Sequence, residues 1–168
     1  KVIEDGETEA HLRTGRTGAL PSTGIGWYRR EISIPAADKG KRVFLEFDGV
    51  MSNARVYVNG QLAGERPYGY VSFNVDITPF VNFGSDNLVE VRAENPPEMS
   101  RFYTGAGIYR PVRLVTTGAT RITPWGISVT TPRVTPREAT VSIVTTVDTP
   151  DNATLTVAHD ILDPDGNR

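Results

Sequence analysis

Short runs of alternating apolar and polar residues constrain the fold of this chain more than any other feature. Residues 43–47 and 71–75 carry an apolar side chain at every second position, and glycine, proline or asparagine residues separate such runs. A period of two predicts strands that bury one face. No segment keeps a convincing helical period, so we expect a chain built from strands and turns.

Nine segments carry the features expected of strands. They are residues 25–34, 43–47, 54–58, 71–75, 88–94, 107–115, 127–131, 139–147 and 153–162. Asn59 and Gly60 are suited to a turn that requires positive φ, and residues 76–80 predict a turn or a single helical turn. Many short strands with turns between them predict an all-β protein, in the form of a jelly-roll β-sandwich.

A boundary between two domains is predicted near residues 118–120. Residues 1–117 are expected to form the jelly roll, with residues 1–24 as an irregular polar arm. Residues 118–168 supply about three strands, in which Pro132 and later prolines separate or end the strands, whereas an immunoglobulin-like sandwich needs about seven. We therefore expect a truncated immunoglobulin-like sandwich. Its uncovered apolar face predicts either poor order or association with another copy, which would make the protein a possible homo-oligomer.

Composition argues against several kinds of partner. The net charge is −2 and the arginines are scattered, whereas nucleic acids require a clustered cationic face. The chain has no cysteine, and neither His11 nor His159 has a second ligand at metal-binding spacing, so we expect no metal and no cofactor. No apolar run approaches the roughly 20 residues that cross a bilayer, so we expect no membrane partner.

The segment 95–105 is the strongest candidate for a binding loop. It carries Glu98, Arg101, Phe102 and Tyr103 close together. Sugars present C–H faces that stack on aromatic rings and hydroxyls that pair with planar polar groups. These residue types predict a loop that faces carbohydrate. The alternative is structural: Phe102 and Tyr103 would close the end of the sandwich, and Arg101 would pair with a carboxylate.

Two carboxylates in another segment allow a catalytic alternative. Glu46 and Asp48 stand at a spacing of two, as in the E-x-D-x-x-E strand of a jelly-roll glycosidase, but Met51 replaces the third acid. Glycoside hydrolysis requires two carboxyl groups across the scissile bond. The simpler interpretation is a solvated outer strand face opposite Val43, Leu45 and Phe47.

Four motifs, taken in order along the chain, resemble a known family. They are GIGWYRREISIP at residues 24–35, RVYVNG at 55–60, DIT at 76–78 and GAGIYR at 105–110. Residues 20–117 thereby resemble the N-terminal sugar-binding domain of glycoside hydrolase family 2, which includes β-galactosidases, β-glucuronidases and β-mannosidases. Residues 118–168 resemble the start of the immunoglobulin-like domain that follows in those enzymes.

The resemblance implies that this chain is part of a longer enzyme in which a different domain carries out catalysis. In this family a (β/α)₈ barrel carries two catalytic glutamates, and a barrel needs at least about 200 residues. The resemblance therefore implies a non-catalytic N-terminal part of a bacterial β-glycosidase, with β-galactosidase favoured, inactive alone and periplasmic or secreted. Its partners would be a carbohydrate and the rest of the enzyme. The alternative is a free-standing carbohydrate-binding module.

The resemblance also assigns structural roles to eight residues: Trp27, Tyr28, Asn59, Gly60, Asp76, Gly105, Gly107 and Arg110. Trp27 and Tyr28 are expected to pack half-buried. Gly105 and Gly107 are expected to adopt backbone conformations closed to other residues, and Arg110 is expected to form an ion pair. Arg101 and Thr23 stand where the best-known β-galactosidases carry an Asp and an Asn that hold the sugar, so those contacts do not carry over.

Overall fold

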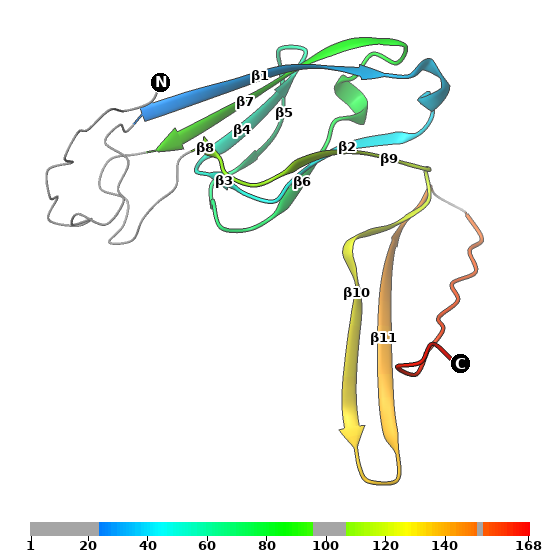
Figure 1. Cartoon of the computed structure of the whole chain (residues 1–168). Helices are drawn as coiled ribbons and strands as arrows, with labels where there is room; N and C mark the ends of the chain where they lie inside the picture. Colours follow the sequence, from blue (N-terminus) through cyan, green and yellow to red (C-terminus); the bar gives the residue numbers. More distant parts are fainter. Residues whose placement is uncertain (1–23, 96–106, 151–152) are drawn as a thin grey trace, which may run out of the picture. The chain divides into compact units, whose positions relative to one another are not determined.

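The computed structural model of the chain describes residues 24–95, 107–150 and 153–168 (Figure 1). The predicted all-β class is confirmed, because these residues form strands and two short 3-10 helices. In chain order the elements are β1 (Gly24–Ile34), η1 (Ala36–Asp38), β2 (Arg42–Phe47), β3 (Val50–Met51), β4 (Ala54–Val58), β5 (Gln61–Arg66), β6 (Phe73–Asp76), η2 (Thr78–Phe80), β7 (Ser85–Asn95), β8 (Gly107–Ile108), β9 (Val112–Thr117), β10 (Arg121–Val134) and β11 (Ala139–Asp148). Within these ranges, no helix has the length and apolar character to span a bilayer.

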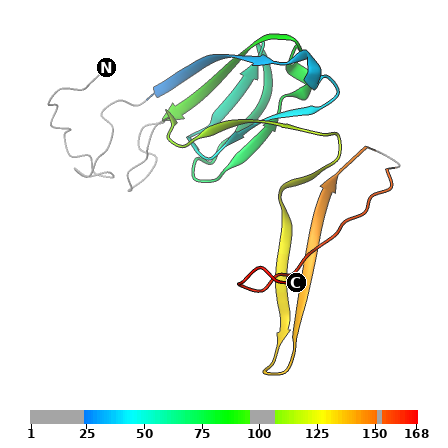
Figure 2. The same cartoon turned by 45° about the vertical axis from the view of Figure 1, so that its right-hand side comes forward.

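The chain divides into two compact units, residues 1–118 and 119–168. In the first unit a four-stranded sheet, ordered β1-β7-β4-β5, faces a three-stranded sheet, ordered β6-β2-β9 (Figures 1 and 2). A short two-stranded ladder joins β3 to β8. All of these neighbouring strands are antiparallel, so the unit is a β-sandwich.

The core lies between the two sheets. It is made of inward-facing residues at alternate strand positions, together with residues at the strand ends: Ile34, Val43, Leu45, Phe47, Val50, Ala54, Val56, Val58, Phe73, Val75, Ile77, Val89, Val91 and Ala93. Phe47 stacks on Phe73 with ring centroids 4.8 Å apart. Phe44 lies on the opposite face of β2 yet is buried, with the guanidinium of Arg42 lying 5.3 Å from the centre of its ring. The outer face of β2 is therefore not solvated throughout.

The turn between β4 and β5 has the predicted geometry. Val58 pairs with Gln61, and the two residues between them have positive φ: 50° at Asn59 and 79° at Gly60. A two-residue loop with positive φ at both positions is a type I′ turn, whose twist matches that of the flanking strands. The Asn-Gly pair thus sets the register next to the turn, and the register shifts between Tyr57 and Val56 farther along the hairpin.

A buried asparagine joins three chain segments at one end of the sandwich. Asn87, at the start of β7, is 1% exposed. Its side-chain oxygen accepts hydrogen bonds from Asn59 Nδ2 at 2.9 Å and from the Asn82 backbone N–H at 2.6 Å. Its amide nitrogen donates to the backbone oxygens of Asn82 and Ser85 at 3.0 and 3.1 Å. All four hydrogen-bonding positions of the buried amide are therefore satisfied.

Asn59 extends this network to the turn it helps to form. Its Nδ2 also donates to the Phe80 carbonyl at 2.8 Å, and its Oδ1 accepts from the Leu88 N–H at 3.0 Å. The backbone of Asn59 donates to the Leu88 carbonyl at 2.8 Å. The hairpin turn, η2 and the start of β7 are thus linked by side-chain amides.

Two predicted strands differ most in their boundaries from the structure, and β5 was not predicted from the sequence. Residues 107–115 form two strands, because β8 pairs with β3 and β9 pairs with β2. Pro132 was expected to separate or end strands, yet β10 continues through it. The pairing with β11 shifts register between Thr130 and Arg133, on either side of this proline. A proline that donates no backbone hydrogen bond is tolerated at such an irregularity.

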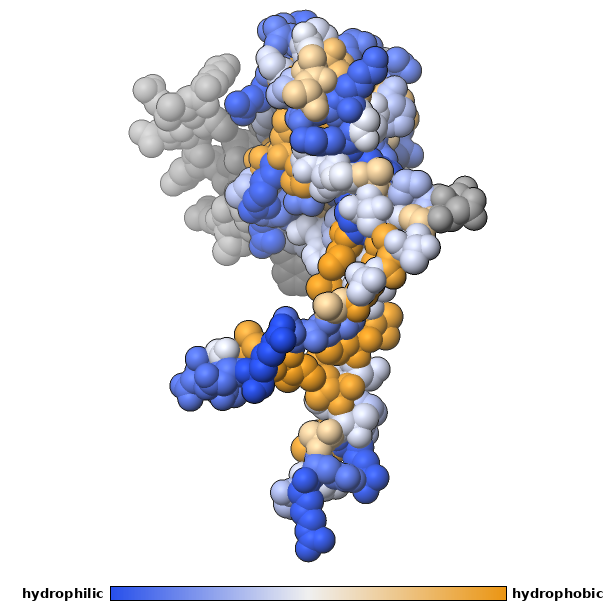
Figure 3. Space-filling view, turned by 90° about the vertical axis from the view of Figure 1, so that its right-hand side faces the viewer, coloured by the Kyte–Doolittle hydropathy of each residue, from blue (hydrophilic) through white to orange (hydrophobic). Residues whose placement is uncertain are grey.

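The second unit contains a two-stranded hairpin in place of the three predicted strands. Residues 153–162 form no strand, because a strand requires a hydrogen-bonded neighbour and the described residues supply none for this segment. Several apolar side chains of the hairpin are exposed, among them Ile127 at 54% and Val129 at 60%, which share one face. Figure 3 shows hydrophobic surface along this unit. Two strands alone cannot enclose a core.

We expect replacement of Asn87 by alanine to lower the free energy of unfolding by about 3 kcal/mol, because each net hydrogen bond contributes about 1 kcal/mol and the buried partners would lose theirs. Urea denaturation followed by circular dichroism measures this. Asn74→Ala, on the outer face of β6, is the matched control and should change stability by less than about 0.5 kcal/mol. Equal effects of the two substitutions would contradict the role given to the Asn87 network.

We expect the second unit to be poorly ordered in dilute solution or to be covered by another copy at higher concentration, because an exposed apolar face favours association. Light scattering over a concentration series measures this. Val129→Glu should reduce association, whereas Thr130→Glu, on the other face of the same strand, should not. A monomer at every concentration, with protected amides in residues 139–148, would contradict the expectation.

Candidate functional site

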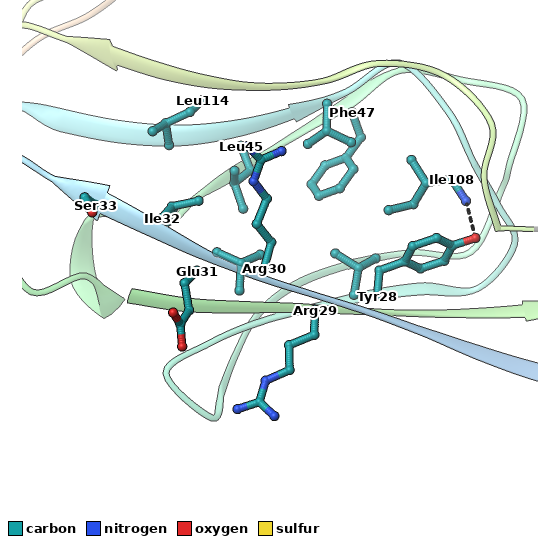
Figure 4. Close-up of a pocket in the computed structure, with 13 residues that line it drawn as sticks. Tyr28, Arg29, Arg30, Glu31, Ile32, Ser33, Leu45, Phe47, Ile108 and Leu114 are labelled. Carbon is teal, nitrogen blue, oxygen red and sulfur yellow. Dashed lines mark hydrogen bonds between the residues drawn. The ribbon is translucent and has the colours of Figure 1, made fainter. Parts of the chain in front are cut away.

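A groove runs along one open edge of the sandwich in the first unit (Figure 4). It lies between β1 and β9, which are the edge strands of their respective sheets. Its volume is about 630 Å³. The residues that line it are Tyr28, Arg29, Arg30, Glu31, Ile32, Ser33, Leu45, Phe47, Val89, Val91, Ile108, Val112 and Leu114.

The alternation of β1 decides which of its side chains enter the groove. Tyr28 and Arg30 pair in register with Val91 and Val89, which belong to the core, so both side chains point inward. Arg29 lies between them and points away (Figure 4). The wall of the groove therefore presents one aromatic ring and one guanidinium.

The floor of the groove is the apolar core itself. Leu45 and Phe47 pair with Leu114 and Val112 of β9, and those two β9 side chains are 43% and 41% exposed although they face the interior. Glu31 points away from the groove (Figure 4). A surface of this kind can bury apolar groups, but it lacks the two facing carboxylates that glycoside hydrolysis requires.

Tyr28 and Gly107 form a close contact at one end of the groove. The Tyr28 hydroxyl accepts a hydrogen bond from the Ile108 N–H at 3.2 Å. Gly107 has φ of +82°, and a Cβ at this position would lie 1.9 Å from that hydroxyl. Only glycine satisfies both constraints. This contact ties the start of β8 to β1.

Trp27 lies on the opposite face of β1 from Tyr28. Its side chain is 59% exposed, and its ring centroid is 5.7 Å from that of Tyr57 in β4. Tyr57 was not singled out from the sequence. Its outward position follows from the alternation of β4, but its proximity to Trp27 depends on β1 and β4 flanking the same strand, β7.

Arg110 stacks on an aromatic neighbour in the described structure. Its guanidinium carbon lies 5.4 Å from the centre of the Tyr109 ring. Tyr109 in turn donates a hydrogen bond from its hydroxyl to the Gly69 carbonyl at 2.8 Å. No ion pair of Arg110 is recorded with the residues that the structure describes, so its predicted ion pair remains a prediction.

The predicted carbohydrate-facing loop lies outside the described residues. This applies to Glu98, Arg101, Phe102 and Tyr103, and also to Gly105. The carbohydrate-facing role of the loop therefore remains a prediction.

The carboxylates of the catalytic alternative lie in unsuitable surroundings. Asp48 pairs with Arg113 at 2.8 Å, and Glu46 is half-buried on the outer face of β2. Met51 belongs to a different strand, β3, and is 4% exposed. The three positions do not line one strand, so the simpler interpretation of a partly solvated outer face is favoured.

Among the described residues, no group of three His, Asp or Glu side chains is arranged to hold a metal ion. His159 is exposed, and its Nε2 lies 2.8 Å from the hydroxyl of Thr145. This hydrogen bond to β11 is sufficient to account for the position of His159.

Asp76 links β6 to the helical turn η2. Its Oδ1 accepts a hydrogen bond from the Thr78 N–H at 3.0 Å, and its other oxygen pairs with Arg42. Partial burial raises the pKa of Asp76, but hydrogen bonds from Thr78 and Arg42 outweigh it and hold the pKa below its ordinary value of 3.8. Asp76 thus caps the start of η2 with a charged carboxylate.

Comparison with known protein families gives a match over most of the first unit. Residues 16–118 match the family model described as glycosyl hydrolases family 2, sugar binding domain. The match includes β1 to β9 and ends at the boundary between the two units.

Individual relatives extend the similarity. The chain is 42% identical over 152 residues to β-galactosidase BoGH2A of Bacteroides ovatus, covering 89% of this chain and 18% of that protein. It is 40% identical over 129 residues to a β-glucuronidase of Bacteroides fragilis, covering 70% and 19%. The crystal structure of a β-glycosidase from Bacteroides vulgatus matches with a TM-score of 0.76 and 34% identity, covering 89% and 19%. The chain thus spans about a fifth of the length of these relatives.

We expect Asp76→Asn to destabilise the chain by up to about 1 kcal/mol near pH 7, because the variant loses the ion pair but keeps an oxygen for Thr78. The folded-state pKa is lowered, so the contribution is fully present above pH 3.8 and is lost as the pH falls through the folded-state value. Urea midpoints of the two proteins should therefore converge at low pH. Asp160→Asn serves as the exposed control, and a difference that persists unchanged in acid would contradict the assignment.

Proposed function

Because the chain belongs to glycoside hydrolase family 2, we propose that it is a non-catalytic accessory part of a β-glycosidase. In this proposal the first unit forms one wall of a substrate pocket that a catalytic domain elsewhere in the polypeptide completes. The second unit is the opening hairpin of an immunoglobulin-like domain. The match to the family's sugar-binding domain over residues 16–118 is the observation that carries the proposal.

The described carboxylates support a non-catalytic role. Asp48, Glu65, Glu94 and Asp148 each form an ion pair with an arginine. Retaining and inverting glycosidases hold two carboxyl groups about 5 to 10 Å apart across the bond they cleave. The groove between β1 and β9 contains no such pair among its lining residues.

We propose a β-galactoside as the substrate of the complete enzyme. The relative from B. ovatus named as a β-galactosidase covers 89% of this chain, against 70% for the B. fragilis protein named as a β-glucuronidase. The identities are similar, so the choice depends on the larger share of the chain that the first match covers. A β-glucuronide is the competing substrate.

We expect the purified chain to release no nitrophenol from nitrophenyl β-galactoside or β-glucuronide above the buffer rate, because no pair of carboxylates lines the groove between β1 and β9. Glu46→Gln should be indistinguishable from the wild-type chain in the same assay. Turnover by the chain that Glu46→Gln abolishes would overturn the non-catalytic proposal and favour catalysis by Glu46 and Asp48.

A further inference from the structure

An aromatic pair stands on the outer face of the four-stranded sheet, away from the groove. Trp27 of β1 and Tyr57 of β4 have ring centroids 5.7 Å apart and ring planes inclined by 36°. β1 and β4 are separated by β7, which places their backbones about 10 Å apart. The two side chains therefore converge above β7 to form one continuous aromatic surface.

The outward position of Trp27 is imposed by register and is not required for packing. Trp27 pairs with Arg92 on the outer face, whereas the next residue, Tyr28, pairs with the core residue Val91. A shift of one residue would expose the whole inner face of β1. Trp27 nevertheless remains 59% exposed, and Tyr57 beside it is half-buried. An aromatic ring that is exposed on a sheet face is available to stack on a ligand.

Charged groups surround the aromatic pair in balanced numbers. The outward positions of β1, β7, β4 and β5 next to the pair carry three arginines and three glutamates: Arg29, Arg55, Arg92, Glu65, Glu90 and Glu94. Arg92 pairs with Glu94 at 3.0 Å, and Arg55 pairs with Glu65 at 3.4 Å. The face therefore offers planar hydrogen-bonding groups without net charge.

We propose that Trp27 and Tyr57 form a stacking site for a neutral oligosaccharide. The C–H face of a pyranose ring would lie on the aromatic surface, and its hydroxyls would pair with the flanking guanidinium and carboxylate groups. The balanced charge disfavours a polyanion, which would require an excess of arginines. The inference rests on the proposed function, since it assumes that the domain meets carbohydrate. It places sugar on the opposite face of β1 from the groove.

The two tryptophans of the chain allow a direct test. Trp27 and Trp125 are the only ones, and Trp125 lies in the second unit. In the Trp125→Phe variant, fluorescence therefore reports Trp27 alone. Titration with β-1,4-linked galactotetraose should give a saturable change in Trp27 emission. Tyr57→Ala in the same background should weaken binding about tenfold, because one stacking surface is lost.

Tyr68→Ala is the matched control, since Tyr68 is an exposed tyrosine that also belongs to an aromatic pair. It should leave the titration unchanged. Calorimetry on the otherwise unmodified chain gives an independent readout, in which Trp27→Ala should abolish the heat of binding. Circular dichroism of each variant verifies folding, and the outward position of Trp27 makes loss of the fold an unexpected result.

Three outcomes would overturn the inference. Trp27 emission could stay unchanged at saturating sugar, calorimetric binding could survive Trp27→Ala, or the emission could vary with protein concentration, which would identify a contact between copies. Each of these leaves the proposed function intact, because that function is tested by the nitrophenyl glycosides. Turnover in that assay would remove the proposed function without affecting the stacking measurement.

Discussion

The hydrogen-bonded amides of Asn59 and Asn87 are the interaction on which the geometry of the first unit depends. A fully buried amide is costly unless each of its positions is paired, and Asn87 pairs all four. Through these bonds the β4–β5 turn, the segment after η2 and the start of β7 hold one relative arrangement. Because β7 lies between β1 and β4, the same network positions both the groove wall and the outer aromatic face.

The strands that could be predicted from sequence were those with a local signature. Alternation identified β2 and β4, and the Asn-Gly pair identified the turn after β4, since each depends on neighbouring residues only. The extent of β10 could not be predicted, because Pro132 interrupts the local pattern and the pairing with β11 resumes beyond it. Residues 153–162 alternate like a strand, but strand formation also depends on a partner elsewhere in the fold.

In the candidate sites, too, some features follow from local sequence and others depend on the order of the strands. The inward residues of β9 face the core, but they are exposed because β9 is the edge strand of its sheet. The meeting of Trp27 with Tyr57 likewise depends on strand order, because thirty residues and another strand separate them. Sequence reasoning assigned Trp27 to a packing role and missed Tyr57, whose only local signal was an aromatic residue at an outward position of β4.

The course of β10 has a consequence for the regularity of the hairpin. Pro124 and Pro132 both lie within this strand, and neither can donate a backbone hydrogen bond. Each lies between two residues at which the pairing with β11 shifts register, so the longest uninterrupted ladder of the hairpin is Ile127–Thr130. Because a register shift bends a strand locally, the two ends of the hairpin can take directions that differ from that of its centre.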